Sequence, residues 1–199
     1  MVLLNPNHRS VAMARLPALE PPFTTDVATR LAAMMPPGAP PIGLFRTFAK
    51  NLPMTAAMSP WGGYELSRQL SLTLREREIV ILRTCARCGC EYEWGVHVMV
   101  FAGRAGLTRS EIASLTHGHA DDSCWTAGRE RALIQVADAL HDASDISDEL
   151  WDSARAVLDE PQLLDLLMLC GWYHAISFAA RATRVDLEPG APRFADVTP

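Results

Sequence analysis

Apolar residues recur at the three- and four-residue spacing of an α-helix through most of this chain. Between residues 74 and 86, for example, Ile79, Leu82 and Cys85 fall on one helical face. Two capping boxes, in which two side chains each satisfy a free backbone donor at a helix start, are recognisable at Thr73–Glu76 and Thr108–Glu111. No segment alternates apolar and polar residues over a useful length, as a half-buried strand would. The sequence therefore predicts an all-α fold with about eight helices joined by short loops.

Proline-rich stretches divide the chain into an arm, a body and a tail. Residues 1–22 are expected to form an irregular N-terminal arm, and residues 23–188 a single all-α domain. Inside that domain the stretch "PPGAPP", residues 36–41, interrupts the helices because each proline lacks a backbone donor. Residues 189–199 are expected to form a polar C-terminal tail. A length of 199 residues agrees with one domain.

Charge and cysteine content exclude several classes of protein. The formal net charge is −5 and the sequence pI is about 5.6, so neither a nucleic-acid partner nor an acidic membrane surface is expected. The longest uncharged run, residues 166–180, contains His174 and is too short and too polar to span a bilayer. Five cysteines and no recognisable secretory signal predict a reduced, cytoplasmic protein without a disulfide framework.

The segment "RTCARCGCEYEWGVH", residues 83–97, concentrates thiols, carboxylates and an imidazole. On a helix, Cys90, Glu93 and His97 lie on one face. Cys90 would sit near the helix start, where free backbone donors and the helix dipole favour a thiolate. If the preceding helix folds back at Gly89, Glu78 can face the same place. These groups are the parts needed for proton transfer.

Four interpretations of this cluster remain open from the residues alone. In the first, Cys90 attacks a peroxide and Cys88 acts as an unusual resolving thiol. In the second, a zinc ion is bound by Cys88, Cys90, Glu93 and His97, but this spacing matches no established ligand pattern, so no metal site is predicted. In the third, the glutamates and the histidine perform acid–base chemistry. In the fourth, buried cysteines and a satisfied glutamate–histidine contact are only part of the core.

The segment "EREIVILRTCARCGCEYEWGVHVMVFAGRAGLTRSEI" resembles the core signature of the carboxymuconolactone decarboxylase and alkylhydroperoxidase D superfamily. That signature is a Glu, then "LR", then C-x-x-C-x-x-x-H, a helix of small residues and "GLT…EI". Its spacings match Glu78, Cys90 and His97 here, and the resemblance extends over about residues 40–188. It implies packed helical hairpins, no cofactor, a small-molecule substrate and a homo-oligomer (a dimer, trimer or hexamer) with sites near subunit interfaces.

The chain departs from the signature at one position, because Glu93 stands where the second motif cysteine is expected. The two-cysteine redox cycle of the peroxidase branch cannot run in its usual form without that thiol. The decarboxylase branch often has E-x-x-x-H at this place, and "EWGVH" is similar to it. The resemblance thus implies a decarboxylase or isomerase of lactones or unsaturated acids. The alternatives are a cysteine-dependent hydroperoxidase, with Cys90 attacking the peroxide, and a non-catalytic binding protein.

The resemblance also implies roles for individual residues. His97 and Glu78 are expected to transfer protons, with Glu93 setting the pKa of His97 and Cys90 lying in the pocket. The long helix from about residue 161 to 183 is expected to line the substrate pocket, so its Tyr173 and His174 are weaker candidates for substrate contact. A core histidine is the competing interpretation of His174. Two aromatic residues of the motif, Tyr92 and Trp94, complete the candidate pocket residues.

Overall fold

The computed structural model describes residues 13–198, and over that range the chain forms nine α-helices and no strand. The helices are α1 (Thr25–Ala33), α2 (Gly43–Phe48), α3 (Leu52–Glu65), α4 (Leu74–Arg87), α5 (Glu91–His97), α6 (Arg109–His117), α7 (Gly128–Ala143), α8 (Asp148–Arg155) and α9 (Glu160–Thr183). A π-helix, Val98–Ala102, follows α5, and a short 3-10 helix, Phe194–Asp196, lies near the C-terminus. The predicted all-α fold is confirmed.

One helix more than predicted arises because the segment after the proline-rich stretch is divided into α2 and α3. Asn51 begins α3 and its side chain accepts a hydrogen bond from the backbone N–H of Met54. Pro53 follows in the first helical turn, where its missing donor costs nothing. The capping boxes at Thr73 and Thr108 are both present with their two hydrogen bonds.

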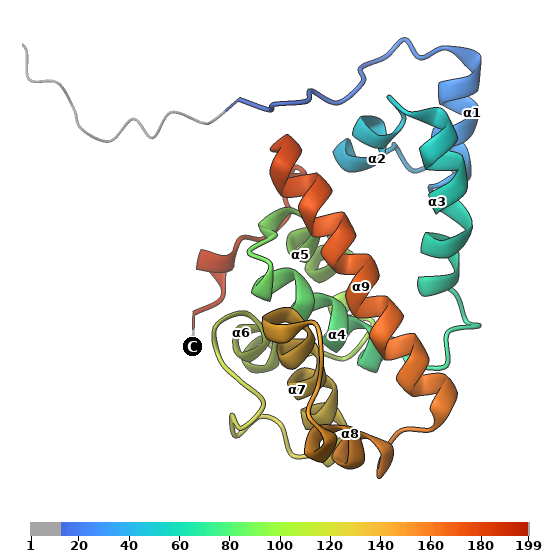
Figure 1. Ribbon diagram of the computed structural model, residues 1–199. Coiled ribbons are helices and arrows are strands. Elements are labelled where there is room, and N and C mark those ends of the chain that lie inside the picture. Colours follow the sequence, from blue (N-terminus) through green and yellow to red (C-terminus); the bar gives the residue numbers. More distant parts are fainter. Residues whose placement is uncertain (1–12, 199) are drawn as a thin grey trace, which may run out of the picture.

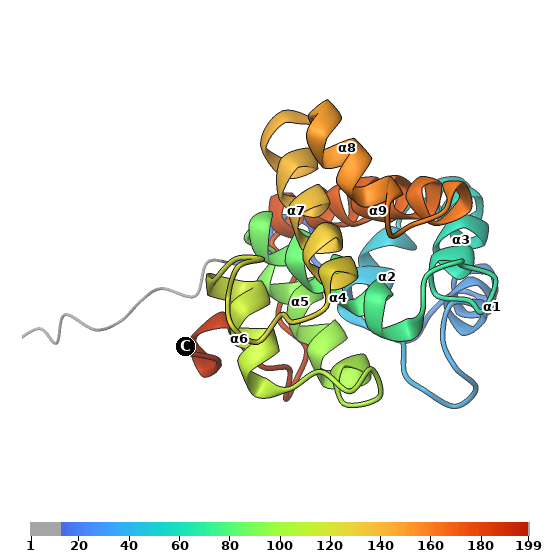
Figure 2. The ribbon, with the colours of Figure 1, turned by 90° about the horizontal axis from the view of Figure 1, so that it is seen from below.

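Helix α4 is the centre of the molecule. All its residues from Glu76 to Cys85 are buried, and it packs against α5, α6, α7 and α9. The helices α1, α2 and α3 lie together as a group beside α4–α7 (Figure 1), and the second view shows the same grouping (Figure 2). The cavity described below is lined by residues of α1–α3 together with residues of α5 and α9.

Helix α9 is long and apolar enough to cross a membrane by length and composition alone. Half of its most apolar window is buried within the structure, against neighbours that include α4, α5 and α7. The uncharged run of residues 166–180 lies within this helix.

The C-terminal tail is more closely attached to the domain than its composition suggests. Residues 1–12 of the expected N-terminal arm lie outside the described residues, and residues 13–24 contain no helix. The expected polar tail packs on α5: the Phe194 ring meets Trp94 edge-on at 5.1 Å, and the Phe194 backbone N–H donates to Glu91 at 2.9 Å. Val197 is buried. Gly95 permits this contact, because a Cβ there would lie 2.7 Å from the Pro192 carbonyl oxygen.

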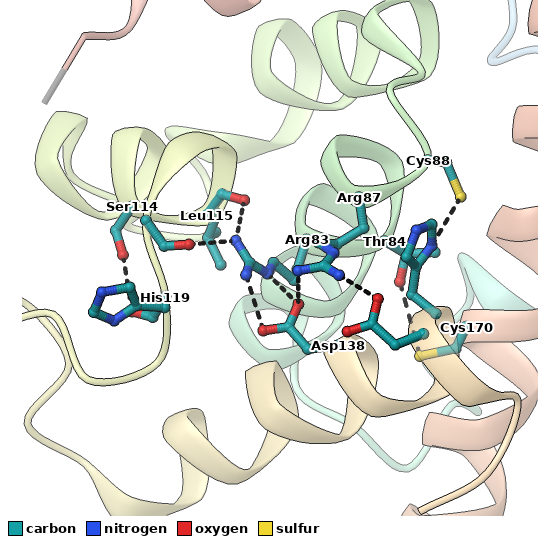
Figure 3. A network of polar contacts seen from close by, with 12 residues as sticks. Arg83, Thr84, Arg87, Cys88, Ser114, Leu115, His119, Asp138 and Cys170 are labelled. Carbon is teal, nitrogen blue, oxygen red and sulfur yellow. Dashed lines mark hydrogen bonds and ion pairs between the residues drawn. The ribbon is translucent and has the colours of Figure 1, made fainter.

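Arg83, a buried arginine of α4, connects this helix to α6 and α7 (Figure 3). Arg83 donates two hydrogen bonds to the carboxylate of Asp138 on α7, at 2.6 and 2.8 Å. It also donates to the carbonyl oxygens of Leu115 on α6, at 3.1 Å, and of Gly118, at 2.9 Å. The carbonyls in the last turn of a helix and just after it have no intrahelical donor, so this guanidinium satisfies groups that would otherwise be buried without partners.

Candidate active site

The turn between α4 and α5 brings the residues of the candidate site together. Helix α4 ends at Arg87, Gly89 takes the left-handed conformation with φ of +62°, and Cys90 is the N-cap of α5. The Cys90 backbone N–H donates to the Cys85 carbonyl at 2.8 Å, which closes the turn. Such a turn favours glycine because a side chain is strained at positive φ. Gly89 therefore makes the fold-back that the sequence predicted.

Glu78 and His97 meet across this hairpin. One carboxylate oxygen of Glu78, Oε2, lies 2.8 Å from His97 Nδ1. The other, Oε1, accepts two hydrogen bonds from Arg77, from Nε at 2.9 Å and from Nη2 at 2.7 Å. All three side chains are buried. Arg77 was not among the predicted site residues. The sequence pointed to it only by placing an arginine directly before Glu78, which α4 buries.

The second ring nitrogen of His97 faces two further polar groups. The Tyr173 hydroxyl of α9 lies 3.1 Å from His97 Nε2, and Glu93 Oε1 lies 3.5 Å from the same nitrogen. The structure thus brings together four of the predicted site residues: Glu78, Glu93, His97 and Tyr173. His97 is the last residue of α5, directly before the π-helix, and such π-turns are frequent at functional sites.

The carboxylates decide the charge of His97. Burial alone would lower the pKa of this imidazole, but the charges of Glu78 and Glu93 and their hydrogen bonds outweigh burial and raise the pKa to about 9. His97 is therefore an imidazolium at neutral pH, with an N–H on each ring nitrogen. It is held between carboxylates on both sides.

This raised pKa predicts a pH-dependent stability. The folded-state pKa lies above the ordinary value of 6.5, so the stabilisation is complete below pH 6.5 and is lost as pH rises through about 9. Between these limits the free energy of unfolding is expected to fall by up to about 1.4 kcal/mol per pH unit. Denaturant unfolding of the wild type across this range measures the slope.

The matched control is His97→Gln, which keeps a hydrogen-bonding side chain but cannot become charged. Its unfolding free energy should lack this slope, although its absolute stability is lower. Equal slopes in the two proteins would show that His97 is not the titrating group.

A cavity of about 170 Å³ adjoins the site on the side of α1–α3. Most of its lining is apolar, and the lining residues are Ala33, Met34, Leu44, Phe45, Phe48, Thr55, Met58, Ser59, Gly62, Gly63, Leu66, Glu93, Trp172, Tyr173 and Ile176. Glu93 and Tyr173 are the polar site residues among them. Among the described residues, no lysine, arginine or histidine contributes to this lining. The sequence did not indicate that α1–α3 line this cavity, because their apolar residues form no recognisable motif.

Glu93 has a free carboxylate oxygen. Its Oε2 atom is buried and has no hydrogen-bond partner among the described residues. An unpaired buried carboxylate oxygen is costly, and such groups in native structures call for an explanation. Because Glu93 lines the cavity, a bound molecule with an acidic hydrogen can supply the missing partner.

Cys90 does not have the environment that the sequence suggested. It is fully buried and is not among the residues that line the cavity. Burial raises the pKa of its thiol to about 11, despite a lowering contribution from a backbone N–H, so Cys90 is a neutral thiol at pH 7. The expected thiolate at the helix start is therefore wrong: desolvation outweighs the free backbone donors. Cys88 is also buried, and burial raises its thiol pKa as well.

Three of the weaker pocket candidates lie elsewhere. The Tyr92 hydroxyl accepts from the Leu44 backbone N–H at 2.9 Å and donates to Glu188 at 2.6 Å, so it connects α2, α5 and the C-terminal segment. Trp94 is buried against that same segment. His174 faces His141 on α7 and does not line the cavity. Among the four weaker candidates, Tyr173 alone borders the cavity.

Comparison with protein families confirms the resemblance. Residues 54–139 match the sequence model of the carboxymuconolactone decarboxylase family. This segment begins in α3, ends in α7 and contains Glu78, Glu93 and His97. A comparison with curated proteins found no significant match.

Solved structures share the fold at low sequence identity. A protein of unknown function from Agrobacterium tumefaciens, named as a "Putative Antioxidant Defence Protein AhpD", is 20% identical with a TM-score of 0.63, over 71% of this chain and 96% of that one. An uncharacterized peroxidase-related protein from Silicibacter sp. TM1040 is 15% identical with a TM-score of 0.75, over 90% and 96%. The debrominase Bmp8 is 16% identical with a TM-score of 0.70, over 87% and 91%.

Proposed function

Residues 54–139 belong to the carboxymuconolactone decarboxylase family, and from this premise we propose that the protein moves a proton on a small, neutral carbonyl compound such as an unsaturated lactone. It does so by acid–base chemistry and without an organic cofactor. The observation that carries this proposal is the free carboxylate oxygen of Glu93 beside a largely apolar cavity. A carboxylate in such a place can accept a proton from a bound molecule.

The roles within the site differ from those inferred from the signature alone. Glu93 takes a proton from carbon next to the substrate carbonyl, and the electron pair of that C–H bond moves into an enolate. The Tyr173 oxygen accepts a hydrogen bond from His97 Nε2–H, which leaves the Tyr173 O–H free to donate to the enolate oxygen. Return of the proton from Glu93 to a different carbon completes an isomerisation. Glu78 and Glu93 hold His97 in its charged state, and Arg77 holds the Glu78 carboxylate in place.

The lining of the cavity favours a neutral substrate over a carboxylate. No cationic side chain of residues 13–198 lines the cavity, and the Glu93 charge would repel a substrate carboxylate. Isomerisation of a lactone is therefore better supported than decarboxylation of an unsaturated acid, which is the other reaction that the sequence suggested. The small volume of the cavity favours a compact molecule.

A thiol-dependent hydroperoxidase is the second candidate function. It is favoured by the grouping of Cys85, Cys88 and Cys90, which lie close enough for the charge of one thiolate to raise the pKa of a neighbouring thiol. The names of two solved relatives refer to antioxidant defence or to peroxidases. Against it stand the raised pKa of the Cys90 thiol and its place outside the cavity.

A screen in D₂O tests the proton-transfer function and does not require the substrate to be identified first. Small unsaturated lactones and enones are incubated with the protein, and NMR follows deuterium incorporation and double-bond migration. We expect turnover of at least one compound by the wild type, and equal turnover by Cys90→Ser, because Cys90 is not in the cavity.

Titration of the reduced protein with tert-butyl hydroperoxide is the complementary measurement. We expect Cys90 to stay reduced under conditions where a low-pKa thiol reacts within seconds. Rapid formation of a Cys90–Cys88 disulfide, together with no deuterium exchange in any compound, would support the hydroperoxidase instead.

A further inference from the structure

A second group of reactive side chains lies apart from the Glu78–His97 site. Cys88 ends α4, His141 is near the end of α7, and His174 is in the middle of α9. Two of these residues, Cys88 and His141, line a surface hollow of about 420 Å³; its other lining residues are Arg87, Ser177, Phe178, Arg181 and Ala182. The cavity beside Glu93 has none of these residues in its lining.

The three side chains are as close as ligands of one metal ion would be. Cys88 Sγ lies 3.8 Å from His141 Nδ1, which lies 3.1 Å from His174 Nε2, and all three atoms are within 4.8 Å of one another. Zinc–sulfur and zinc–nitrogen bonds of about 2.3 and 2.0 Å at tetrahedral angles place two nitrogens about 3.3 Å apart and a sulfur and a nitrogen about 3.5 Å apart. The Cys88–His141 and His141–His174 separations differ from these values by only a few tenths of an ångström.

Hydrogen bonding prepares His174 as a ligand. Its Nδ1 lies 2.8 Å from the carbonyl oxygen of Cys170, one turn earlier on α9. A carbonyl only accepts hydrogen bonds, so Nδ1 carries the hydrogen and Nε2 presents a lone pair toward His141. Metal-binding histidines commonly have this arrangement, because the outer hydrogen bond fixes the tautomer and orients the ring.

The other two residues border the hollow together with Arg87 and Arg181. As metal ligands, His141 would be neutral and Cys88 would be a thiolate. Figure 3 shows Cys88 at the end of its helix, close to Arg87 and Thr84. A divalent ion would add the charge needed to displace the thiol proton.

We propose that Cys88, His141 and His174 form a binding site for a zinc-like divalent cation. One thiolate and two imidazoles are a ligand set typical of zinc. The fourth position faces the hollow, where water or hydroxide completes the tetrahedron. Arg181, whose Nη1 donates to the Cys88 carbonyl at 2.6 Å, adds positive charge that favours hydroxide or a small anion there. The sequence predicted no metal site, because these ligands are 53 and 33 residues apart.

Metal titration of the full-length protein tests the site. After treatment with a chelator, the reduced protein is titrated with Zn²⁺ by calorimetry and with Co²⁺ by absorption spectroscopy. We expect one ion per chain, the intense visible bands of tetrahedral cobalt, and a near-ultraviolet thiolate-to-cobalt band. Absence of stoichiometric binding would overturn the proposal.

Single substitutions test which side chains bind the metal ion. Cys88→Ser should abolish the thiolate-to-cobalt band, and His141→Gln and His174→Gln should each weaken zinc binding by at least tenfold. Matched controls are Cys124→Ser and His119→Gln, which lie outside the cluster and should bind zinc like the wild type. Circular dichroism of the metal-free proteins checks that every variant is folded. Binding that is unchanged in folded His141→Gln and His174→Gln would overturn the proposal.

The metal site and the proposed enzyme activity can fail separately. Glu93→Gln removes the proposed base but none of the metal ligands, so it should bind zinc with wild-type affinity. Zinc binding by this variant would therefore support the site even if the lactone screen found no substrate.

Discussion

Replacing Glu93 with glutamine is expected to lower kcat for a substrate found in the lactone screen by about 10²–10⁴-fold, the usual contribution of a positioned base. Glutamine has nearly the same shape, so it preserves the cavity, but it cannot accept a proton at neutral pH. KM should change little, because the loss concerns the transition state more than binding. Steady-state kinetics with deuterium incorporation as a second readout measure both effects.

Two variants make this prediction specific. Tyr173→Phe removes the proposed donor to the enolate oxygen and should lower kcat by about 10²–10³-fold, in the range for loss of one such donor. Glu65→Gln is the matched control, since Glu65 is also a buried glutamate but does not line the cavity. If Glu65→Gln and Glu93→Gln lowered kcat equally, the assignment of Glu93 as the base would be wrong.

Replacing Arg83 with methionine is expected to destabilise the fold by about 3–5 kcal/mol, as when one partner of a buried ion pair is removed. Methionine fills similar space but leaves the Asp138 carboxylate without its two hydrogen bonds from Arg83 and the carbonyls of Leu115 and Gly118 without a donor. Because these groups belong to α6, α7 and the loop after α6, the loss affects several helix contacts together. Guanidinium chloride unfolding measures the change.

Two further variants distinguish loss of the Arg83 hydrogen-bond network from loss of a single positive charge. Arg155→Met removes an exposed arginine at the end of α8 and should change stability by no more than about 0.5 kcal/mol. Arg83→Lys keeps the charge but cannot make the paired contact with Asp138, so it should fall between the two. A loss below about 1 kcal/mol in Arg83→Met would show that the network contributes little.

Local signals in the sequence were sufficient to predict most of the helices. The capping boxes at Thr73 and Thr108, and the apolar spacing between them, depend on residues within one or two turns of each other. The division into α2 and α3 was missed, because Asn51 and Pro53 are also compatible with a short irregularity inside one helix. In the folded chain the Asn51 cap decides between these alternatives.

The part of the candidate site that lies on the α4–α5 hairpin could be predicted from the sequence. Glu78, Glu93 and His97 lie within twenty residues, and the turn at Gly89 fixes their relation. The charge state of Cys90 was not predictable, since it depends on desolvation by helices distant in sequence. The cavity and the contact of Tyr173 with His97 likewise require the packing of α9 and α1–α3.

Gly95 has a practical consequence for work with this protein. The Pro192 carbonyl occupies the space that a side chain at position 95 would need, so the C-terminal segment presses directly on α5. The same helix carries Glu93 and His97. An affinity tag or fluorescent label fused after residue 199 would therefore extend from a segment that supports the site. Rates measured on such a fusion would reflect the effect of the tag or label as well as the activity of the protein itself.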